Sequence, residues 1–111
     1  MPSVLVIGEA LVDVVHGIDG EIKNIPGGSP ANTAVALARL GTKTYMKART
    51  SSDQFGLEIR KHLTNQNVNL DYSLVVSSPS SVINALIQKD GSARYEANLE
   101  GAADYGWTLE E

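Results

Sequence analysis

The residues best suited to hold a ligand are a glycine pair, Gly27 and Gly28, followed closely by Asn32. Glycine has no Cβ, so the backbone of the pair can adopt unusual angles and approach a ligand closely. Ser29 is a good helix N-cap and Pro30 suits the first helical position, so a helix is expected directly behind the glycines. Its free N–H groups and partial positive charge, with the Asn32 amide one turn in, predict the floor of a small-ligand site.

Asp13 is the second candidate, because it is the one carboxylate in an otherwise apolar stretch, residues 10–15. Burying a carboxylate without a partner is costly. The residue alone leaves two interpretations open. Asp13 points outward as the alternate residue of a strand, or it accepts hydrogen bonds from ligand hydroxyls, each worth about 1.5–3 kcal/mol. Its position after an apolar strand, where α/β sheets bind ligands, favours the ligand-binding interpretation.

Other kinds of chemistry find little support in the sequence. A bare Gly-Gly-x-x-x-Asn pattern is a weak motif, and neither Gly-x-Gly-x-x-Gly nor a P-loop is present, so no nucleotide-phosphate site is recognisable. The chain has no cysteine, and neither histidine lies in a metal-ligand spacing, so no metal site is expected. The basic pairs Lys47 with Arg49 and Arg60 with Lys61 are interpreted as solvated faces.

The elements that position the candidate residues begin with an apolar run at Val4–Ile7, which predicts a strand buried on both faces. Asp19-Gly20 predicts a hairpin. The helix behind the glycines is expected near residues 30–40, with Gly41 as its C-terminal stop. A strand is expected next, at residues 43–47.

A second helix is indicated by Phe55, Ile59 and Leu63, which recur four residues apart. Its N-cap is Ser51, Ser52 or Asp53, which the sequence does not decide between. The remainder predicts short strands at residues 73–76, 82–88 and 93–99, with a second hairpin at Asp90-Gly91.

The totals describe one modest domain of 111 residues, with 42% hydrophobic and 20% charged residues. The net charge of −4 argues against nucleic acid or an anionic membrane surface as partner. The apolar run after Ser3 is too short for a signal peptide or a membrane span, so a cytoplasmic protein is expected. Thr108 predicts a helix start too short to be a finished element, so the chain is interpreted as the front part of a larger α/β protein.

Several segments form a specific family pattern when they are taken together in their order, although no single one is specific. They are Val4–Glu9 with Asp13, Gly27-Gly28 with Asn32, Ser52–Gly56, Asp90-Gly91 and Glu100–Asp104. In this order they resemble the ribokinase/fructokinase (PfkB-type) carbohydrate kinase family over essentially the whole chain. The resemblance implies a three-layer α/β/α fold with a small β-sheet lid over the sugar, of which residues 1–111 are the N-terminal, substrate-binding portion. Lid strands are expected near residues 14–25 and 73–99, and such a lid often forms a homodimer interface.

The resemblance also implies roles for individual residues. Asp13, Gly27, Gly28 and Asn32 match the family positions that bind the sugar. The family's Gly-Ala-Gly-Asp motif, which supplies the catalytic base and an anion hole, and its ATP-binding part lie further along the family's chain and are not found here. No catalytic or metal-binding residue is therefore assigned, and ATP and Mg²⁺ are expected only for a full-length enzyme.

The sequence departs from the family pattern at three places. Ala48 and Ser51 stand where the family usually has glycines, and Ala97 stands at a lid position that is often aromatic. Fructose is the expected sugar, while ribose, a keto-sugar acid or a nucleoside would need similar residues. The leading hypothesis is the sugar-binding part of an ATP-dependent sugar kinase, and the alternative is a non-catalytic sugar-binding or dimerising module of the same family.

Overall fold

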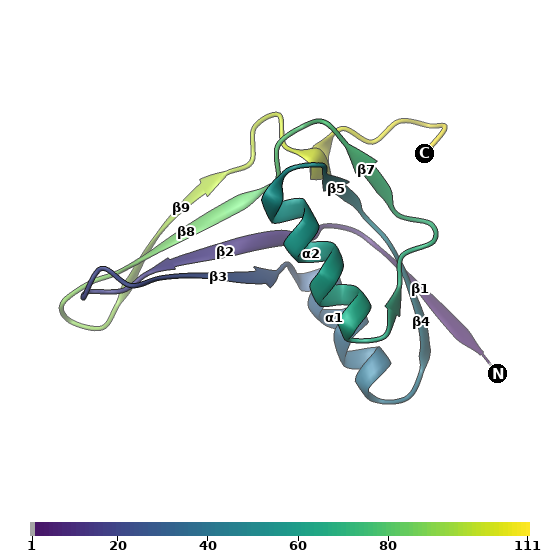
Figure 1. Cartoon of the computed structure of the whole chain (residues 1–111), viewed down its shortest axis with the longest axis horizontal. Helices are drawn as coiled ribbons and strands as arrows, with labels where there is room; N and C mark the ends of the chain where they lie inside the picture. The colour runs from purple at the N-terminus through teal and green to yellow at the C-terminus, as the bar shows by residue number, and fades with distance from the viewer. Residues whose placement is uncertain (1) are drawn as a thin grey trace.

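The computed structural model describes residues 2–111, which form three sheets, two α-helices and one short 3-10 helix (Figure 1). In chain order the elements are β1 Ser3–Ile7, β2 Leu11–His16, β3 Ile22–Gly27, α1 Ser29–Arg39, β4 Lys43–Lys47, β5 Arg49–Ser51, α2 Gln54–Asn65, β6 Val68–Asn69, β7 Leu74–Val76, β8 Val82–Ile87, β9 Ala93–Asn98 and η1 Ala103–Tyr105. Among the described residues, no helix is long and apolar enough to cross a membrane.

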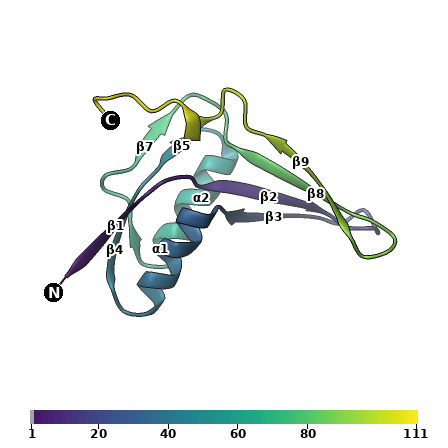
Figure 2. The same ribbon diagram turned by 180° about the vertical axis from the view of Figure 1, so that it is seen from behind.

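The body of the molecule consists of a parallel sheet in the order β1-β4-β6, both α-helices and the small parallel pair β5-β7. Both helices pack on one face of the β1-β4-β6 sheet (Figures 1 and 2). The core between them is built from side chains of the sheet and of the two helices, chiefly Val6, Met46, Ala34, Ile59 and Leu63.

The expectation that Val4–Ile7 is buried on both faces is wrong. Alternate residues of β1 point to opposite faces, and Leu5 and Ile7 are 47% and 62% exposed. The physical reason is that the described residues place helices on only one face of this sheet, so the other face of β1 has no covering layer.

The second large sheet projects away from the body and is called the projecting sheet here; its strand order is β3-β2-β8-β9 (Figure 1). Strands β2 and β8 are parallel neighbours at its centre, and each forms an antiparallel hairpin with an edge strand. Gly20 and Gly91 have φ values of +85° and +86°, which confirms the turns expected at Asp19-Gly20 and Asp90-Gly91. Of the expected lid segment 73–99, residues 74–76 pair with β5 in the body instead.

Helix boundaries differ from the expectations by one position. Gly28, and not Ser29, is the N-cap of α1, so Pro30 is the second residue of the helix. The Asp53 side chain caps α2 by accepting a 2.8 Å hydrogen bond from the amide of Gly56, which decides between the three expected caps. Residues from Thr108 form a turn closed by the Glu111 side chain, and no helix, within the described chain.

Candidate functional site

The carboxylate of Asp13 lies against the backbone of Gly27. Asp13 sits on β2 opposite Ile25 of β3, and the two strands end with Leu11 facing Gly27. A Cβ atom on Gly27 would come within 2.8 Å of the Asp13 Oδ2 atom, so any larger residue there would force the carboxylate to move from this position. Asp13 is half-buried and Gly27 is buried. The structure therefore brings together two residues that are fourteen positions apart in the sequence.

Apolar side chains flank the carboxylate on the same face of the projecting sheet. In the strand register, Asp13 lies between Ile25 of β3 and Ile83 of β8, and Ile83 in turn faces Ala97 of β9. Residues in register share one face of a sheet. A charged acceptor within an apolar row suits a ligand that presents hydroxyl groups and C–H surface together.

Gly28 turns the chain from the projecting sheet into α1. Its φ and ψ angles of 101° and 134° fall where L side chains are rare, so glycine is needed at this turn. A Cβ atom on Gly28 would also come within 3.1 Å of the Glu9 carbonyl oxygen. The start of α1 has no side-chain cap, which leaves amide groups at this helix end available to an acceptor on a ligand.

Asn32 lies in the first turn of α1, where its backbone amide donates a 2.9 Å hydrogen bond to the Gly28 carbonyl. Asn32 is exposed, so its side-chain amide is open to a ligand. Pro30, at the start of the same helix, packs closely on Gly8 at the end of β1; a Cβ on Gly8 would come within 2.6 Å of Pro30 Cγ. That contact fixes the start of α1 relative to the body. Asp13 therefore contacts Gly27, and Gly28 connects Gly27 to the helix turn that carries Asn32.

A buried polar cluster beside the site was not expected from the sequence. The Arg49 side chain donates a 2.8 Å hydrogen bond to the Ala103 carbonyl, and its Nε lies 3.1 Å from Glu111 Oε1 in an ion pair without hydrogen-bond geometry. Ser81 Oγ and Asp104 Oδ2 are buried there and have no hydrogen-bond partner among the described residues.

Burial raises the pKa of Asp104, and the negative charge of Glu9 adds to the rise. The Ser81 hydroxyl, which lies nearby without full hydrogen-bond geometry, the Ala10 amide and the positive charge of Arg49 act in the opposite direction. The interpretation of Arg49 as part of a solvated face is wrong, since the residue is only 9% exposed. Arg60 likewise binds Thr50 Oγ1 and the Ser51 carbonyl. Their partners lie 9 to 62 positions away, and the local charge pattern contains no signal of such contacts.

The departures from the family pattern are accommodated in ordinary backbone. Ala48 and Ser51 are buried, and the only described non-glycine residue with a positive φ is Asn67, so neither position needs a glycine conformation. Ala97 lies exposed on β9, in the register row of Asp13.

Comparison with known proteins places the chain in a family. The family model described as "pfkB family carbohydrate kinase" matches residues 1–111. The chain belongs to the pfkB carbohydrate kinase family. The pfkB assignment confirms the resemblance carried by the glycine pair, Asp13 and the later motifs.

Individual relatives agree with the pfkB assignment. The chain is 30% identical to a fructokinase of Klebsiella pneumoniae over 103 residues, covering 92% of this chain and 34% of that protein. It is 28% identical to a fructokinase of Vibrio alginolyticus, covering 100% of this chain and 36% of the relative. The chain thus spans about a third of the length of these curated relatives.

Solved structures show the same fold. A fructokinase from Xylella fastidiosa superposes with a TM-score of 0.90 at 26% identity, covering 97% of this chain and 37% of that one. A putative ribokinase II from E. coli superposes with a TM-score of 0.83 at 22% identity. The described residues are therefore the N-terminal part of a ribokinase-like α/β fold, as expected from the resemblance.

Proposed function

We propose that residues 1–111 form the sugar-binding N-terminal part of an ATP-dependent, fructokinase-like carbohydrate kinase, which phosphorylates a sugar hydroxyl in a full-length enzyme. The observation that carries the proposal is the Asp13 carboxylate held against the side-chain-free backbone of Gly27. A carboxylate is an acceptor-only group, and sugar hydroxyls are donors, so the pair forms charge-assisted hydrogen bonds.

The other candidate residues have complementary roles in this proposal. The Asn32 amide both donates to and accepts from hydroxyl groups. Gly27 and Gly28 let the sugar approach the backbone, and the amides at the start of α1 face it. We infer that the projecting sheet, which carries Asp13, is the lid that excludes water from the bound sugar. D-fructose is the proposed substrate, supported by the names of several relatives.

ATP and Mg²⁺ belong to the proposal for a full-length enzyme. A fructokinase structure from Xylella fastidiosa that resembles this chain contains bound ATP, with a TM-score of 0.88. Phosphoryl transfer also requires a divalent metal and a base at the attacking hydroxyl. Within residues 2–111, no three His, Asp or Glu side chains gather to hold a metal ion. The proposed action of this chain's own residues is to bind and orient the sugar.

The test is replacement of the carboxylate. In a full-length enzyme carrying this sequence, Asp13→Ala is expected to weaken D-fructose binding about tenfold or more, because a charge-assisted hydrogen bond contributes roughly 1.5–3 kcal/mol. Turnover should fall as well, since the hydroxyl is no longer oriented. Calorimetry with D-fructose and steady-state kinetics measure the two effects. Asp71→Ala, at an exposed aspartate of the body, is the matched control. Unchanged affinity and turnover for Asp13→Ala would refute the proposal.

A panel of D-fructose, D-ribose, a keto-sugar acid and a nucleoside tests the substrate in the same assay. The alternative function is a non-catalytic sugar-binding or dimerising module of the same family. Reading the coding region beyond Glu111 separates the two: an in-frame Gly-Ala-Gly-Asp supports the kinase, and a stop codon supports the module. The expected cytoplasmic location stays a prediction.

We also propose a homodimer formed through the projecting sheet. Its edge strands β3 and β9 each have an unpaired side among the described residues, and unpaired edges are templates for strand pairing. Exposed apolar side chains lie on the same sheet, including Ile25 at 49% and Tyr95 at 70% exposure. These two features together support association through this sheet.

A further inference from the structure

A carboxylate of the body binds the segment that links the body to the central strand β8. Residues 77–81, Ser77-Ser78-Pro79-Ser80-Ser81, run from β7 in the body to β8 in the projecting sheet. A serine-rich linker is ordinarily exposed and mobile. Here Ser80 and Ser81 are only 7% and 1% exposed, so the end of the linker is packed.

Asp53 binds this linker and caps α2 at the same time. Its Oδ1 atom accepts a 2.8 Å hydrogen bond from the Gly56 amide and a 2.6 Å bond from Ser80 Oγ. Its Oδ2 atom accepts a 2.9 Å bond from the Ser80 amide. Burial tends to raise the pKa of Asp53, but the bonds from Ser80, Gly56 and Ser51 outweigh it and lower the pKa below its ordinary value. These hydrogen bonds therefore favour the charged form of Asp53.

The helix end of this contact is rigidly attached to the body. Gly56 packs directly on the Ser51 backbone, with no room for a Cβ atom. Arg60, one turn further along α2, donates to Thr50 Oγ1 at 2.9 Å and to the Ser51 carbonyl at 2.7 Å. Asp53 thus presents its carboxylate to the linker from a fixed position.

The linker end of the contact leads directly to the candidate sugar site. The Ser81 carbonyl accepts a 3.2 Å hydrogen bond from the amide of Val12, the residue next to Asp13. The Pro79 carbonyl accepts a 2.7 Å bond from the Ala103 amide, so the chain leaving β9 is tied to the same linker. Two successive contacts, Asp53 with Ser80 and Ser81 with Val12, therefore connect α2 to Asp13.

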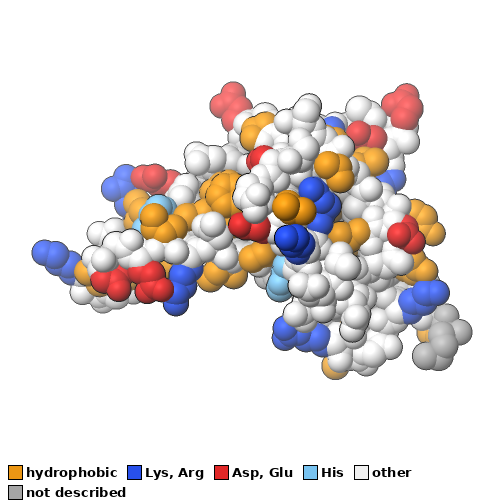
Figure 3. All heavy atoms as spheres, viewed as in Figure 1, with side chains coloured by type: hydrophobic (Ala, Val, Ile, Leu, Met, Phe, Trp, Pro, Cys, Tyr) orange, Lys and Arg blue, Asp and Glu red, His pale blue; other side chains and the backbone are white. Residues whose placement is uncertain are grey.

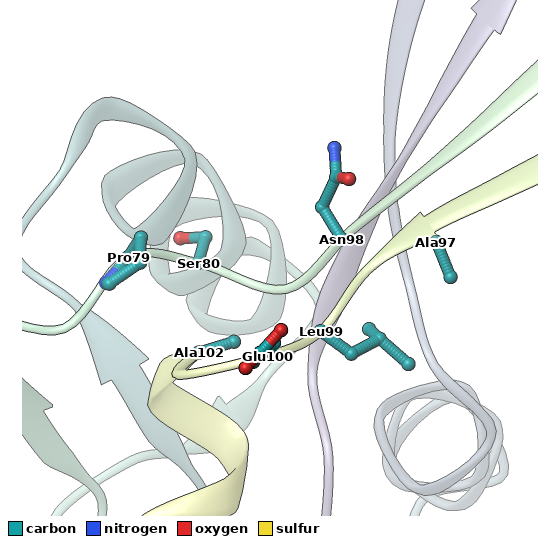
Figure 4. A pocket seen from close by; sticks show the side chains of 7 residues that line it. All are labelled: Pro79, Ser80, Ala97, Asn98, Leu99, Glu100 and Ala102. Carbon is teal, nitrogen blue, oxygen red and sulfur yellow. The ribbon is translucent and has the colours of Figure 1, made fainter.

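On one side the linker borders a hollow and is not covered by packed side chains. An open pocket lies between the linker and the segment that leaves β9, and its lining residues are Pro79, Ser80, Ala97, Asn98, Leu99, Glu100 and Ala102 (Figure 4). A hollow on this side provides no van der Waals contact to resist movement of the linker. Hydrogen bonds therefore resist such a movement: those of Ser80 to Asp53, and those that the Pro79 and Ser81 carbonyls accept.

We propose that Asp53 and Ser80 form a joint that sets the position of the projecting sheet relative to the body, and that Ser80 is a positioning residue for the sugar site. The sheet carries Asp13, and the body carries Asn32 on α1, so the joint sets how the two side chains meet one sugar. The role in sugar binding rests on the proposed function, while the role in holding the sheet does not.

In a full-length enzyme carrying this sequence, the test uses Ser80→Ala, which removes the 2.6 Å hydroxyl bond but keeps the backbone bond and the cap of α2. Ser77→Ala is the matched control, because Ser77 is an exposed serine of the same linker. We expect D-fructose affinity to fall about tenfold in Ser80→Ala and to be unchanged in Ser77→Ala, since hydrogen bonds to charged groups are the strong ones. Ser80→Thr, which keeps the hydroxyl, is expected to restore affinity.

Amide NMR spectra and hydrogen exchange supply the readout that does not depend on sugar. The amides of Val12 and Asp13 should shift and exchange faster in Ser80→Ala, while those in the middle of α2 stay protected. If Ser80→Ala does not fold, Ser80→Cys, whose thiol is a weak donor, is measured in the same way. Unshifted Val12 and Asp13 amides in the folded variant would overturn the joint.

The two proposals fail in distinguishable ways. If the wild-type full-length enzyme binds no D-fructose but the amides shift as expected, the proposed function fails and the joint stands. If the amides shift but affinity is unchanged, Ser80 holds the sheet without positioning the sugar site, and the positioning role is overturned.

Discussion

At the scale of single residues, the site depends on space as much as on charge. The Asp13 carboxylate occupies the volume that a side chain on Gly27 would need. The sequence alone left Asp13 between a solvent-facing and a ligand-facing interpretation, because a strand residue has only two directions available. The contact with Gly27 depends on strand register, which pairs Leu11 with Gly27 and Asp13 with Ile25. Register is set by the whole sheet, and no single motif contains it.

Gly27→Ala is expected to weaken D-fructose binding about tenfold while the protein stays folded. The new Cβ would lie 2.8 Å from Asp13 Oδ2, so the carboxylate must rotate away from its position. A displaced acceptor loses much of a charge-assisted hydrogen bond, which contributes roughly 1.5–3 kcal/mol. Calorimetry gives the affinity and urea unfolding gives the stability. Ser29→Ala, two positions along at an exposed residue, is the control. Wild-type affinity in Gly27→Ala would contradict the prediction.

At the scale of elements, the sequence predicted those with strong local signals. The two Asp-Gly hairpins, the strand at residues 43–47 and both helices are present. Local turn chemistry and helical spacing are sufficient for these elements. The short strands β5 and β6 were not expected, since two or three residues carry no periodicity and depend on their parallel partners. The buried links between elements, such as Asp53 with Ser80, join residues far apart and have no local signal.

The segment after β9 carries a pH-dependent prediction. Asp104 ends the buried stretch that begins at Ala102, and burial raises its pKa above the ordinary value of 3.8. A carboxyl whose pKa is higher in the folded than in the unfolded protein adds to the free energy of unfolding at low pH. This added stability is lost as the pH rises through the folded-state pKa. At pH 7 the charged carboxylate is therefore destabilising. Asp104→Asn removes this charge and is expected to raise the free energy of unfolding at pH 7.

Urea unfolding of Asp104→Asn and wild type at pH 7 and at pH 3.5 measures the effect. The advantage of the variant should shrink at pH 3.5, where the wild-type carboxyl is protonated. Glu9, which adds to the raised pKa, and Arg49, which reduces it, stay unchanged in both proteins. Glu110→Gln, at an exposed carboxylate near the end of the chain, is the control and should show no such difference. A variant less stable than wild type at pH 7 would refute the assignment.

At the scale of the whole molecule, apolar surface is exposed in two separate places. The chain measures 49 × 31 × 18 Å, with the projecting sheet extending from the body, and hydrophobic side chains reach the surface of both parts (Figure 3). On the body, Leu5, Ile7 and Tyr72 are exposed at the sheet face without helices. On the projecting sheet, Ile25 and Tyr95 are exposed. Exposed apolar patches commonly mark interaction surfaces, so each of the two faces is a candidate site of association.

The proposed homodimer predicts which of these faces matters. Tyr95 lies on the edge strand β9 and is 70% exposed, so Tyr95→Asp places a charge within the proposed interface. Tyr72→Asp is the same substitution at a 56% exposed position on the body, where the ring packs 5.4 Å from that of Tyr45. Sedimentation velocity should show a wild-type dimer, a Tyr95→Asp dimer weakened about tenfold or more, and an unaffected Tyr72→Asp dimer. A monomeric wild type would contradict the proposed homodimer. A dimer that is lost only in Tyr72→Asp would exclude the projecting sheet as the interface, because association must then occur through the helix-free face of the body.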